Sequence, residues 1–262
     1  MILRGNFSST VLCMSTNIQV FIPERYSGPY RVVYLLHGLH GDQGTWLDNT
    51  MLPLYAREHN AIFVMPEVGR SFYFNLKYGR RYFDYVCDEL PEMTKKIFNI
   101  SSRREDTAAI GCSMCGYGAL RMALAKPELF GFCGAISPAA LYFKPLLDGL
   151  RTTPEQYLKT GHEAQEIYKD LKCNYGDGLE YRRDYDIPEI AKDFPSDKPK
   201  PKIYSVCGTE DSLLPENQKF ADEMKNTSFD FTYQEWTGGH DWYFFNEALK
   251  RIFELFCNRE PS

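Results

Sequence analysis

The chain has 262 residues, of which 44% are hydrophobic and 25% charged, and these ordinary values exclude a disordered or fibrous protein. This length suits one globular domain, because α/β folds commonly reach it as a single unit. The net charge of -5, with Lys and Arg spread along the chain, argues against nucleic acid as a partner.

The beginning of the chain shows no export signal. Residues 1–6 lack a basic segment followed by an apolar stretch and a cleavage site. No run approaches the roughly 18 apolar residues of a membrane helix. The eight cysteines therefore read as free thiols and not as a disulfide framework. We expect a cytoplasmic protein with no membrane partner.

Short β-rich runs alternate with longer amphipathic runs, which is typical of parallel strands joined by helices. Residues 7–14 and 17–22 should open the fold as an antiparallel pair. Later strands are expected at residues 31–36, 61–65, 107–110, 132–136, 202–206 and 229–236. Helices are expected at residues 51–58, 82–98, 116–125, 163–171, 217–225 and 242–256. Pro91 is a candidate kink in the second of these helices. The pattern predicts a mostly parallel central sheet flanked by helices.

Residues 138–200 interrupt this alternation. The stretch is rich in proline and carries only short helical pieces. A connection this long inside a compact domain is usually functional or a lid. We therefore expect one domain over residues 1–262, with residues 138–200 as an insertion or cap over the active site.

The most informative segment is residues 107–118, where a strand meets a tight turn and a helix. Ser113 stands at the turn. A serine in such a turn is held in a strained conformation that presents its hydroxyl over the edge of the sheet, and small neighbours let strand and helix approach. Gly111 meets that need, whereas Cys115 stands where a second glycine is usual. These features predict a nucleophile at Ser113.

Two other interpretations of this segment are open. Ser113 is also a suitable residue for capping the helix that follows. Cys112 and Cys115 form a C-x-x-C pair, which near a strand-helix unit can be redox-active. The sequence context of thioredoxin-like motifs is missing, so buried bystander thiols are the better interpretation.

A nucleophilic serine requires an imidazole to take its proton and a carboxylate to orient that imidazole. In this architecture they follow the serine in the order acid, then histidine, each on a loop after a strand. The exit loop of the strand at residues 202–206 contains Glu210 and Asp211, and His240 follows the last strand. We favour Asp211 as the acid, with Glu210 as the neighbouring alternative and helix capping as the non-catalytic role of Asp211. No spacing of ligands suggests a metal site.

The glycine-rich loop after the third expected strand contains His37, Gly38, Leu39 and His40. In this architecture one oxyanion-hole amide comes from such a loop and the other from the residue after the nucleophile. We expect these amides to be those of Leu39 and Met114. His37 and His40 are expected to hold the loop, with direct proton transfer as the less favoured role.

Together these motifs resemble the esterase D-like branch of the α/β-hydrolases, with tributyrin esterases, S-formylglutathione hydrolases, feruloyl and acetylxylan esterases and mycolyltransferases. The resemblance spans nearly the whole chain and is closest to the tributyrin esterases. The family usually has Gly at the position of Cys115, and the mycolyltransferases have Ala there. The motifs that carry the resemblance are Leu35-Leu36-His37-Gly38 with Trp46, Tyr73 with Tyr78-Gly79, Gly111-x-Ser113-Met114 with Gly116-Tyr117-Gly118, Gly208-x-x-Asp211, and Gly239-His240-Asp241-Trp242.

The resemblance implies an α/β-hydrolase fold with a catalytic triad of Ser113, Asp211 and His240, and an oxyanion hole at Leu39 and Met114. We further expect Trp46, Tyr73, Phe143 and Trp242 to bind substrate.

The expected activity is that of a serine carboxylesterase acting on short acyl esters, acetyl to butyryl, through an acyl-enzyme and without cofactor or metal. The alternatives are an S-formylglutathione hydrolase, a feruloyl or acetylxylan esterase, and a catalytically inactive binding protein. The last would lack a triad residue, and none is missing. The expected partner is a small-molecule ester, and the sequence leaves open whether the chain forms a homo-oligomer.

Overall fold

The computed structural model describes residues 1–258 and shows, over that range, one eight-stranded sheet in the order β1-β2-β4-β3-β5-β6-β7-β8. Strands β3 to β8 pair in parallel, and β1 and β2 extend one edge in antiparallel pairing. The strands are β1 (Ile2–Ser9), β2 (Met14–Phe21), β3 (Arg31–Leu36), β4 (Ala61–Pro66), β5 (Thr107–Cys112), β6 (Phe132–Ile136), β7 (Lys202–Gly208) and β8 (Phe231–Trp236). The predicted mostly parallel α/β fold is confirmed.

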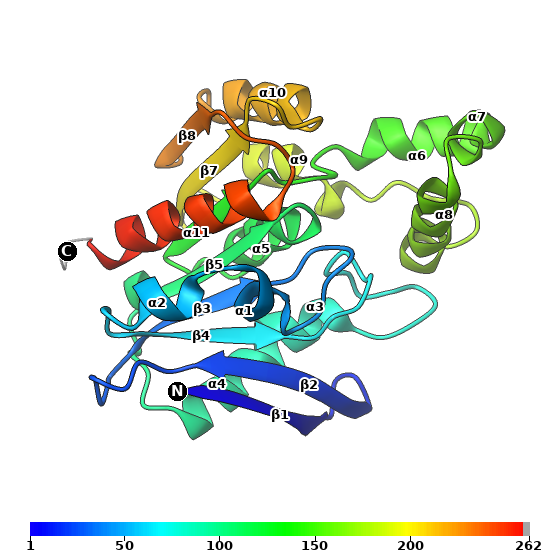
Figure 1. Cartoon of the computed structure of the whole chain (residues 1–262). Helices are drawn as coiled ribbons and strands as arrows, with labels where there is room; N and C mark the ends of the chain where they lie inside the picture. The colour runs from blue at the N-terminus through cyan, green and yellow to red at the C-terminus, as the bar shows by residue number, and fades with distance from the viewer. Residues whose placement is uncertain (259–262) are drawn as a thin grey trace.

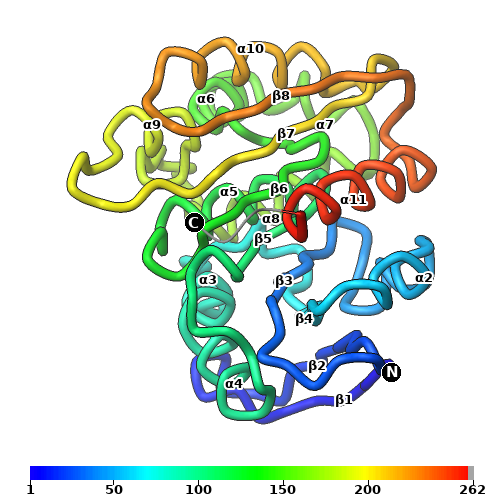
Figure 2. Tube along the Cα trace, turned by 90° about the vertical axis from the view of Figure 1, so that its left-hand side faces the viewer, coloured from blue at the N-terminus to red at the C-terminus, as the bar shows by residue number. Residues whose placement is uncertain are grey.

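Helices cover both faces of the sheet. Figure 2 shows α2 and α11 on one side and α3, α4 and α9 on the other. The central strands β4, β5 and β6 are buried along their whole length, which explains their continuous apolar sequences. The helices are α1 (Thr45–Asn49), α2 (Leu52–Ala56), α3 (Tyr82–Asp84), α4 (Leu90–Ile97), α5 (Met114–Ala125), α6 (Phe143–Thr152), α7 (Pro154–Leu158), α8 (His162–Tyr175), α9 (Ile187–Lys192), α10 (Leu214–Met224) and α11 (Trp242–Cys257). Across residues 1–258, no helix combines the length and apolar character that crossing a bilayer requires.

The opening strand pair differs from its prediction. The first strand begins at Ile2 and ends at Ser9, so the expected strand over residues 7–14 is wrong in position. Residues 2–6 are exposed, because β1 is the edge of the sheet and pairs only with β2. An edge strand without a buried face shows no alternation of apolar and polar residues, so the pattern could not mark it.

The long helix expected over residues 82–98 contains an irregular middle. A π-helical segment, Tyr85–Glu89, joins α3 to α4, and the Leu90 amide bonds the Tyr85 carbonyl. Pro91 follows in the first turn of α4. Proline has no amide hydrogen to donate to the preceding turn, so a wider turn at this point is a natural consequence.

Four helices, α6 to α9, lie between β6 and β7 within the described chain. Figure 1 places α6, α7 and α8 beyond the carboxyl ends of the parallel strands. Two prolines of this stretch begin helices and do not exclude them: Pro154 and Pro188 stand in the first turns of α7 and α9. The helix α6 was missed although its apolar residues recur at helical spacing.

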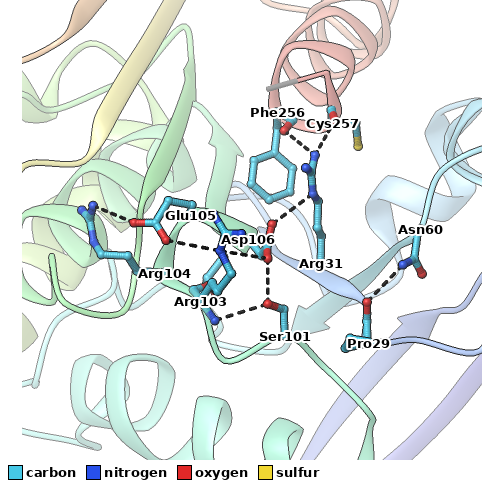
Figure 3. A network of polar contacts seen from close by, with 11 residues as sticks. Pro29, Arg31, Asn60, Ser101, Arg103, Arg104, Glu105, Asp106, Phe256 and Cys257 are labelled. Atoms are coloured by element: carbon cyan, nitrogen blue, oxygen red, sulfur yellow. Dashed lines mark hydrogen bonds and ion pairs between the residues drawn. The ribbon is translucent and has the colours of Figure 1, made fainter. Parts of the chain in front are cut away.

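A polar network closes the opposite, amino edge of the sheet (Figure 3). Arg31, at the start of β3, lies 3.1 Å from the Asp106 carboxylate and donates to the Phe256 and Cys257 carbonyls near the end of α11. Asp106 also accepts a 2.7 Å hydrogen bond from the Ser101 hydroxyl. One guanidinium thus joins the start of β3 and the turn before β5 to the carboxyl end of a helix, where positive charge is favourable.

Candidate active site

Ser113 forms the turn between β5 and α5. Its backbone has φ 58° and ψ −126°, a left-handed conformation that is strained for a residue with a side chain. The Ser113 side chain makes no capping hydrogen bond to the helix, so capping does not account for this residue. The chain instead presents a half-buried hydroxyl at the first turn of a helix, where free amides and the helix dipole favour negative charge.

The small residue before the turn is required by close packing. A Cβ atom at Gly111 would lie 2.5 Å from the Cys115 carbonyl oxygen, so only glycine fits where β5 meets α5. Cys115 occupies the second small position and is fully buried. The steric requirement of the turn is therefore met by one glycine and one cysteine.

His240 and Asp211 come together from two separate loops. The Nδ1 atom of His240 lies 2.8 Å from Oδ2 of Asp211. Asp211 follows β7, and His240 follows β8. The two loops touch closely, since a Cβ at Gly208 would lie 2.1 Å from the Gly238 carbonyl oxygen. Parallel neighbouring strands place these loops at the same edge of the sheet as Ser113.

The environment of Asp211 favours its ionised form. Burial raises the pKa of this carboxyl, but hydrogen bonds from His240, the Leu213 amide and the Ser137 hydroxyl together bring it below its ordinary value. The Asp211 side chain is fully buried, whereas that of His240 is 34% exposed. The neighbouring Glu210 is exposed, and the contact with the imidazole belongs to Asp211.

The glycine-rich loop after β3 is held in place by buried polar contacts. The Val68 amide donates to Nε2 of His37 over 3.0 Å, which puts the proton of the neutral imidazole on Nδ1, 2.9 Å from the Gly38 carbonyl oxygen. The Tyr73 hydroxyl donates to the His37 carbonyl over 2.8 Å. His37 is buried, and its contacts are those of a residue that holds the loop.

A cavity of about 1150 Å³ brings the proposed catalytic groups together. Ser113, His240, Leu39 and Met114 all line it. The opposite wall comes from the chain between β6 and β7, with lining residues that include Phe143, Pro145, Leu146, Tyr157, Ile167 and Leu171. The cavity therefore lies between the carboxyl edge of the sheet and α6 to α8.

The four residues expected to bind substrate divide into two pairs. Phe143 and Trp242 line the cavity. Trp46 and Tyr73 do not, and the expectation that they contact substrate is corrected. Trp46 is buried behind Trp242, with ring centroids 5.2 Å apart, and Tyr73 is buried under the His37 loop. Both residues support the wall of the cavity from behind.

Sequence reasoning missed two cavity-lining residues of α8, Ile167 and Leu171. Their four-residue spacing within the expected helix was the available signal, since it places both on one face. His40 also lines the cavity, and its Nε2 atom lies 3.2 Å from the Glu163 carboxylate at the start of α8. In residues 1–258, no three His, Cys, Asp or Glu side chains converge as metal ligands.

Known proteins match this chain consistently over nearly its whole length. Residues 9–256 match the family described as putative esterase. An acetyl esterase of Caldicellulosiruptor saccharolyticus is 30% identical, with 97% of each chain covered. Two Staphylococcus aureus structures are similar at 27% identity. They are fluorophosphonate-binding serine hydrolase F, covering 99% of both chains with a TM-score of 0.85, and an S-formylglutathione hydrolase, covering 98% of this chain and 99% of the other with a TM-score of 0.82.

Proposed function

The chain belongs to the putative esterase family, the esterase D-like branch of the α/β-hydrolases, and we propose that Ser113, His240 and Asp211 are the catalytic triad of this serine carboxylesterase. The observation that carries the proposal is the 2.8 Å contact of His240 with Asp211, on loops that share one cavity with the strained Ser113. The same cavity contains Leu39 and Met114, the proposed oxyanion-hole residues.

The contacts favour a definite order of proton transfers. Asp211 accepts the Nδ1 hydrogen of His240, which leaves Nε2 free to take the Ser113 proton. Ser113 Oγ then bonds to the ester carbonyl carbon, and the carbonyl oxygen becomes an anion that the Leu39 and Met114 amides stabilise. When this intermediate collapses, the bond to the alcohol oxygen breaks and Nε2 protonates that oxygen. Water, activated by the same imidazole, releases the acid from Ser113.

We propose acetyl to butyryl esters as the substrates. The acetyl esterase matched over 97% of both chains supports this acyl range. Much of the 1150 Å³ cavity then remains for the alcohol, because an acyl group of a few carbons fills only a small part of it. We also propose that residues 138–200 act as the cap of the site, which their share of the cavity wall supports.

A thioester substrate is the second candidate. It is favoured by the similarity to the S-formylglutathione hydrolase, which covers almost all of both chains. The same serine, imidazole and oxyanion hole serve ester and thioester alike, so the choice depends on the groups that receive the leaving alcohol or thiol.

A substrate panel and covalent labelling test the proposal. The panel comprises p-nitrophenyl esters of increasing acyl length, S-formylglutathione, methyl ferulate and acetylated xylo-oligosaccharides. We expect the largest kcat/KM for acetyl to butyryl esters, and a fluorophosphonate adduct on Ser113 by mass spectrometry. An adduct on another residue contradicts the triad, whereas a preference for S-formylglutathione contradicts only the substrate.

We also propose a cytoplasmic location without a nucleic-acid partner. All eight cysteines, which lie within residues 1–258, are free thiols, as a reducing compartment allows. The net charge of -5 supports the absence of nucleic acid. Fractionation of the native cell followed by activity assay tests the location, and recovery of the activity outside the cytoplasm contradicts it.

A further inference from the structure

The Cys115 thiol lies directly against the turn that presents Ser113. Cys115 is fully buried on the first turn of α5. It stands at the position where the family resemblance gives Gly, or Ala in the mycolyltransferases, and neither of those residues has a polar side chain. The thiol is therefore a feature of this chain that the common machinery of the fold does not explain.

Strand β5 ends at this place, where its last residue, Cys112, pairs with Ile136 of β6. The pairing of β3 with β5 ends at Leu36 and Gly111, one residue before Cys112. The Leu36 carbonyl accepts a 2.6 Å hydrogen bond from the Trp46 indole. Cys112 is thus the last residue of β5, buried and beyond the end of its neighbour on that side. Buried backbone amides and carbonyls need partners, and an unpaired group is costly.

The Cys115 thiol contacts both backbone polar groups of Cys112. The Cys112 amide donates to Sγ of Cys115 over 2.8 Å, and the same thiol donates to the Cys112 carbonyl over 2.6 Å. Burial raises the pKa of the Cys115 thiol well above its ordinary value, so the hydrogen that it donates stays in place. One side chain thereby hydrogen-bonds to both the amide and the carbonyl of Cys112, the residue immediately before Ser113.

We propose that Cys115 is a positioning residue for catalysis: its thiol fixes the backbone of Cys112 and so holds Ser113 in its strained, reactive orientation. This inference rests on the proposed role of Ser113 as nucleophile. Cys115 does not line the cavity, so its effect reaches the reaction through the turn and not through substrate contact. The strained φ of 58° at Ser113 is kept only if its surroundings hold it.

Three variants test the role, each assayed with reductant present. Cys115→Ala removes both hydrogen bonds, and we expect kcat to fall about tenfold while KM changes by less than about twofold. The rate of fluorophosphonate labelling at Ser113 should fall by the same factor. Cys115→Ser keeps a group that donates and accepts, and we expect it to restore most of both rates. Cys133→Ala deletes an equally buried thiol on β6 and should leave both rates unchanged.

Activity per folded molecule separates positioning from stability. The folded, active fraction is measured by the amount of fluorophosphonate bound at completion, and the rates are divided by it. The inference is overturned if Cys115→Ala retains the wild-type rates after this correction, or if Cys115→Ser fails to recover activity. A wild-type protein that is not labelled at Ser113 contradicts the proposed triad itself, so the two failures are distinguishable.

Discussion

The carboxyl and amino edges of the sheet differ in backbone strain and in what lies beside them. At the carboxyl edge, Ser113 and Ser137 hold left-handed φ values of 58° and 41°, and the cavity opens beside them. At the amino edge, Arg31 and Asp106 close a network of hydrogen bonds around the end of α11. Backbone strain thus lies at the edge of the proposed catalytic site, whereas the amino edge is joined by an ion pair and hydrogen bonds.

This difference between the two edges predicts that activity and stability respond to different substitutions. The proposed catalytic residues at the carboxyl edge lie on loops, and replacing them should leave the apolar core largely intact. Residues at the amino edge join strands to a helix far from the cavity. Substitution of the proposed catalytic residues should therefore chiefly change kcat, whereas substitutions at the amino edge should change the free energy of unfolding.

The largest effect is expected for Ser113→Ala. Removing the attacking oxygen should lower kcat about 10⁴-fold or more, with little change in melting temperature because the hydroxyl caps nothing. Steady-state kinetics and a thermal melt on the same preparation measure both quantities. If this variant kept a nearly normal kcat, Ser113 would not be the nucleophile, and the proposed active site at the carboxyl edge would be wrong.

Asp211→Asn should come next, with kcat reduced about 10³- to 10⁴-fold, because the amide no longer fixes the tautomer of His240. The matched control is Glu210→Gln, which changes the adjacent, exposed carboxylate and should leave kcat unchanged. If the two effects were reversed, the acid of the triad would be Glu210.

Two residues of the cavity wall should differ in their effects, one on stability and the other on acyl selectivity. Phe143 lies within 5.4 Å of the Tyr117 and Phe74 ring centroids and is fully buried, so Phe143→Ala should cost about 3–5 kcal/mol of stability. Leu146 lines the cavity from a half-buried position, and Leu146→Ala should shift the kcat/KM ratio of butyryl to acetyl esters by about tenfold. Urea melts and an ester series measure the two effects. If Phe143→Ala shifted acyl selectivity without loss of stability, the assignment of Phe143 to the packed core would be wrong.

The amino edge should respond in stability alone. Arg31→Met removes a partly buried guanidinium from three acceptors and should lower the free energy of unfolding by about 1–3 kcal/mol. The control Arg25→Met removes an exposed ion pair with Glu58 and should cost at most about 1 kcal/mol. Values of kcat below the melting range should match wild type in both variants, and a selective loss of kcat in Arg31→Met contradicts the separation of the edges.

The smallest effect is a pH dependence of stability at Asp211. Its pKa is lower in the folded protein than in the unfolded chain, so the carboxylate stabilises the fold above its unfolded pKa of about 3.9. That contribution is lost as pH falls through the folded pKa. The difference in melting temperature between wild type and Asp211→Asn should therefore shrink below about pH 4. A difference that stays constant or widens on acidification contradicts this linkage.

Much of the fold and the chain order of the proposed triad could be predicted from the sequence. Apolar runs marked the buried strands, whereas β1 was misplaced because residues 2–6 are exposed and show no pattern. Ser113 and His240 were recognisable because each follows a strand, and parallel strands bring such loops to one edge. The sequence favoured Asp211 over Glu210, but both occupy the same loop, so Glu210 was kept as the alternative.

Local chemistry along the chain was enough to define the strand-helix alternation, the tight turn at Ser113 and the chain order of acid and imidazole. Only the tertiary structure decided that Asp211 contacts His240, that Trp46 and Tyr73 lie behind the cavity wall, and that the Cys115 thiol brackets Cys112. The physical reason is that periodicity and turn chemistry depend on neighbours in sequence. Side-chain contacts and burial depend instead on which strands and helices the fold brings together.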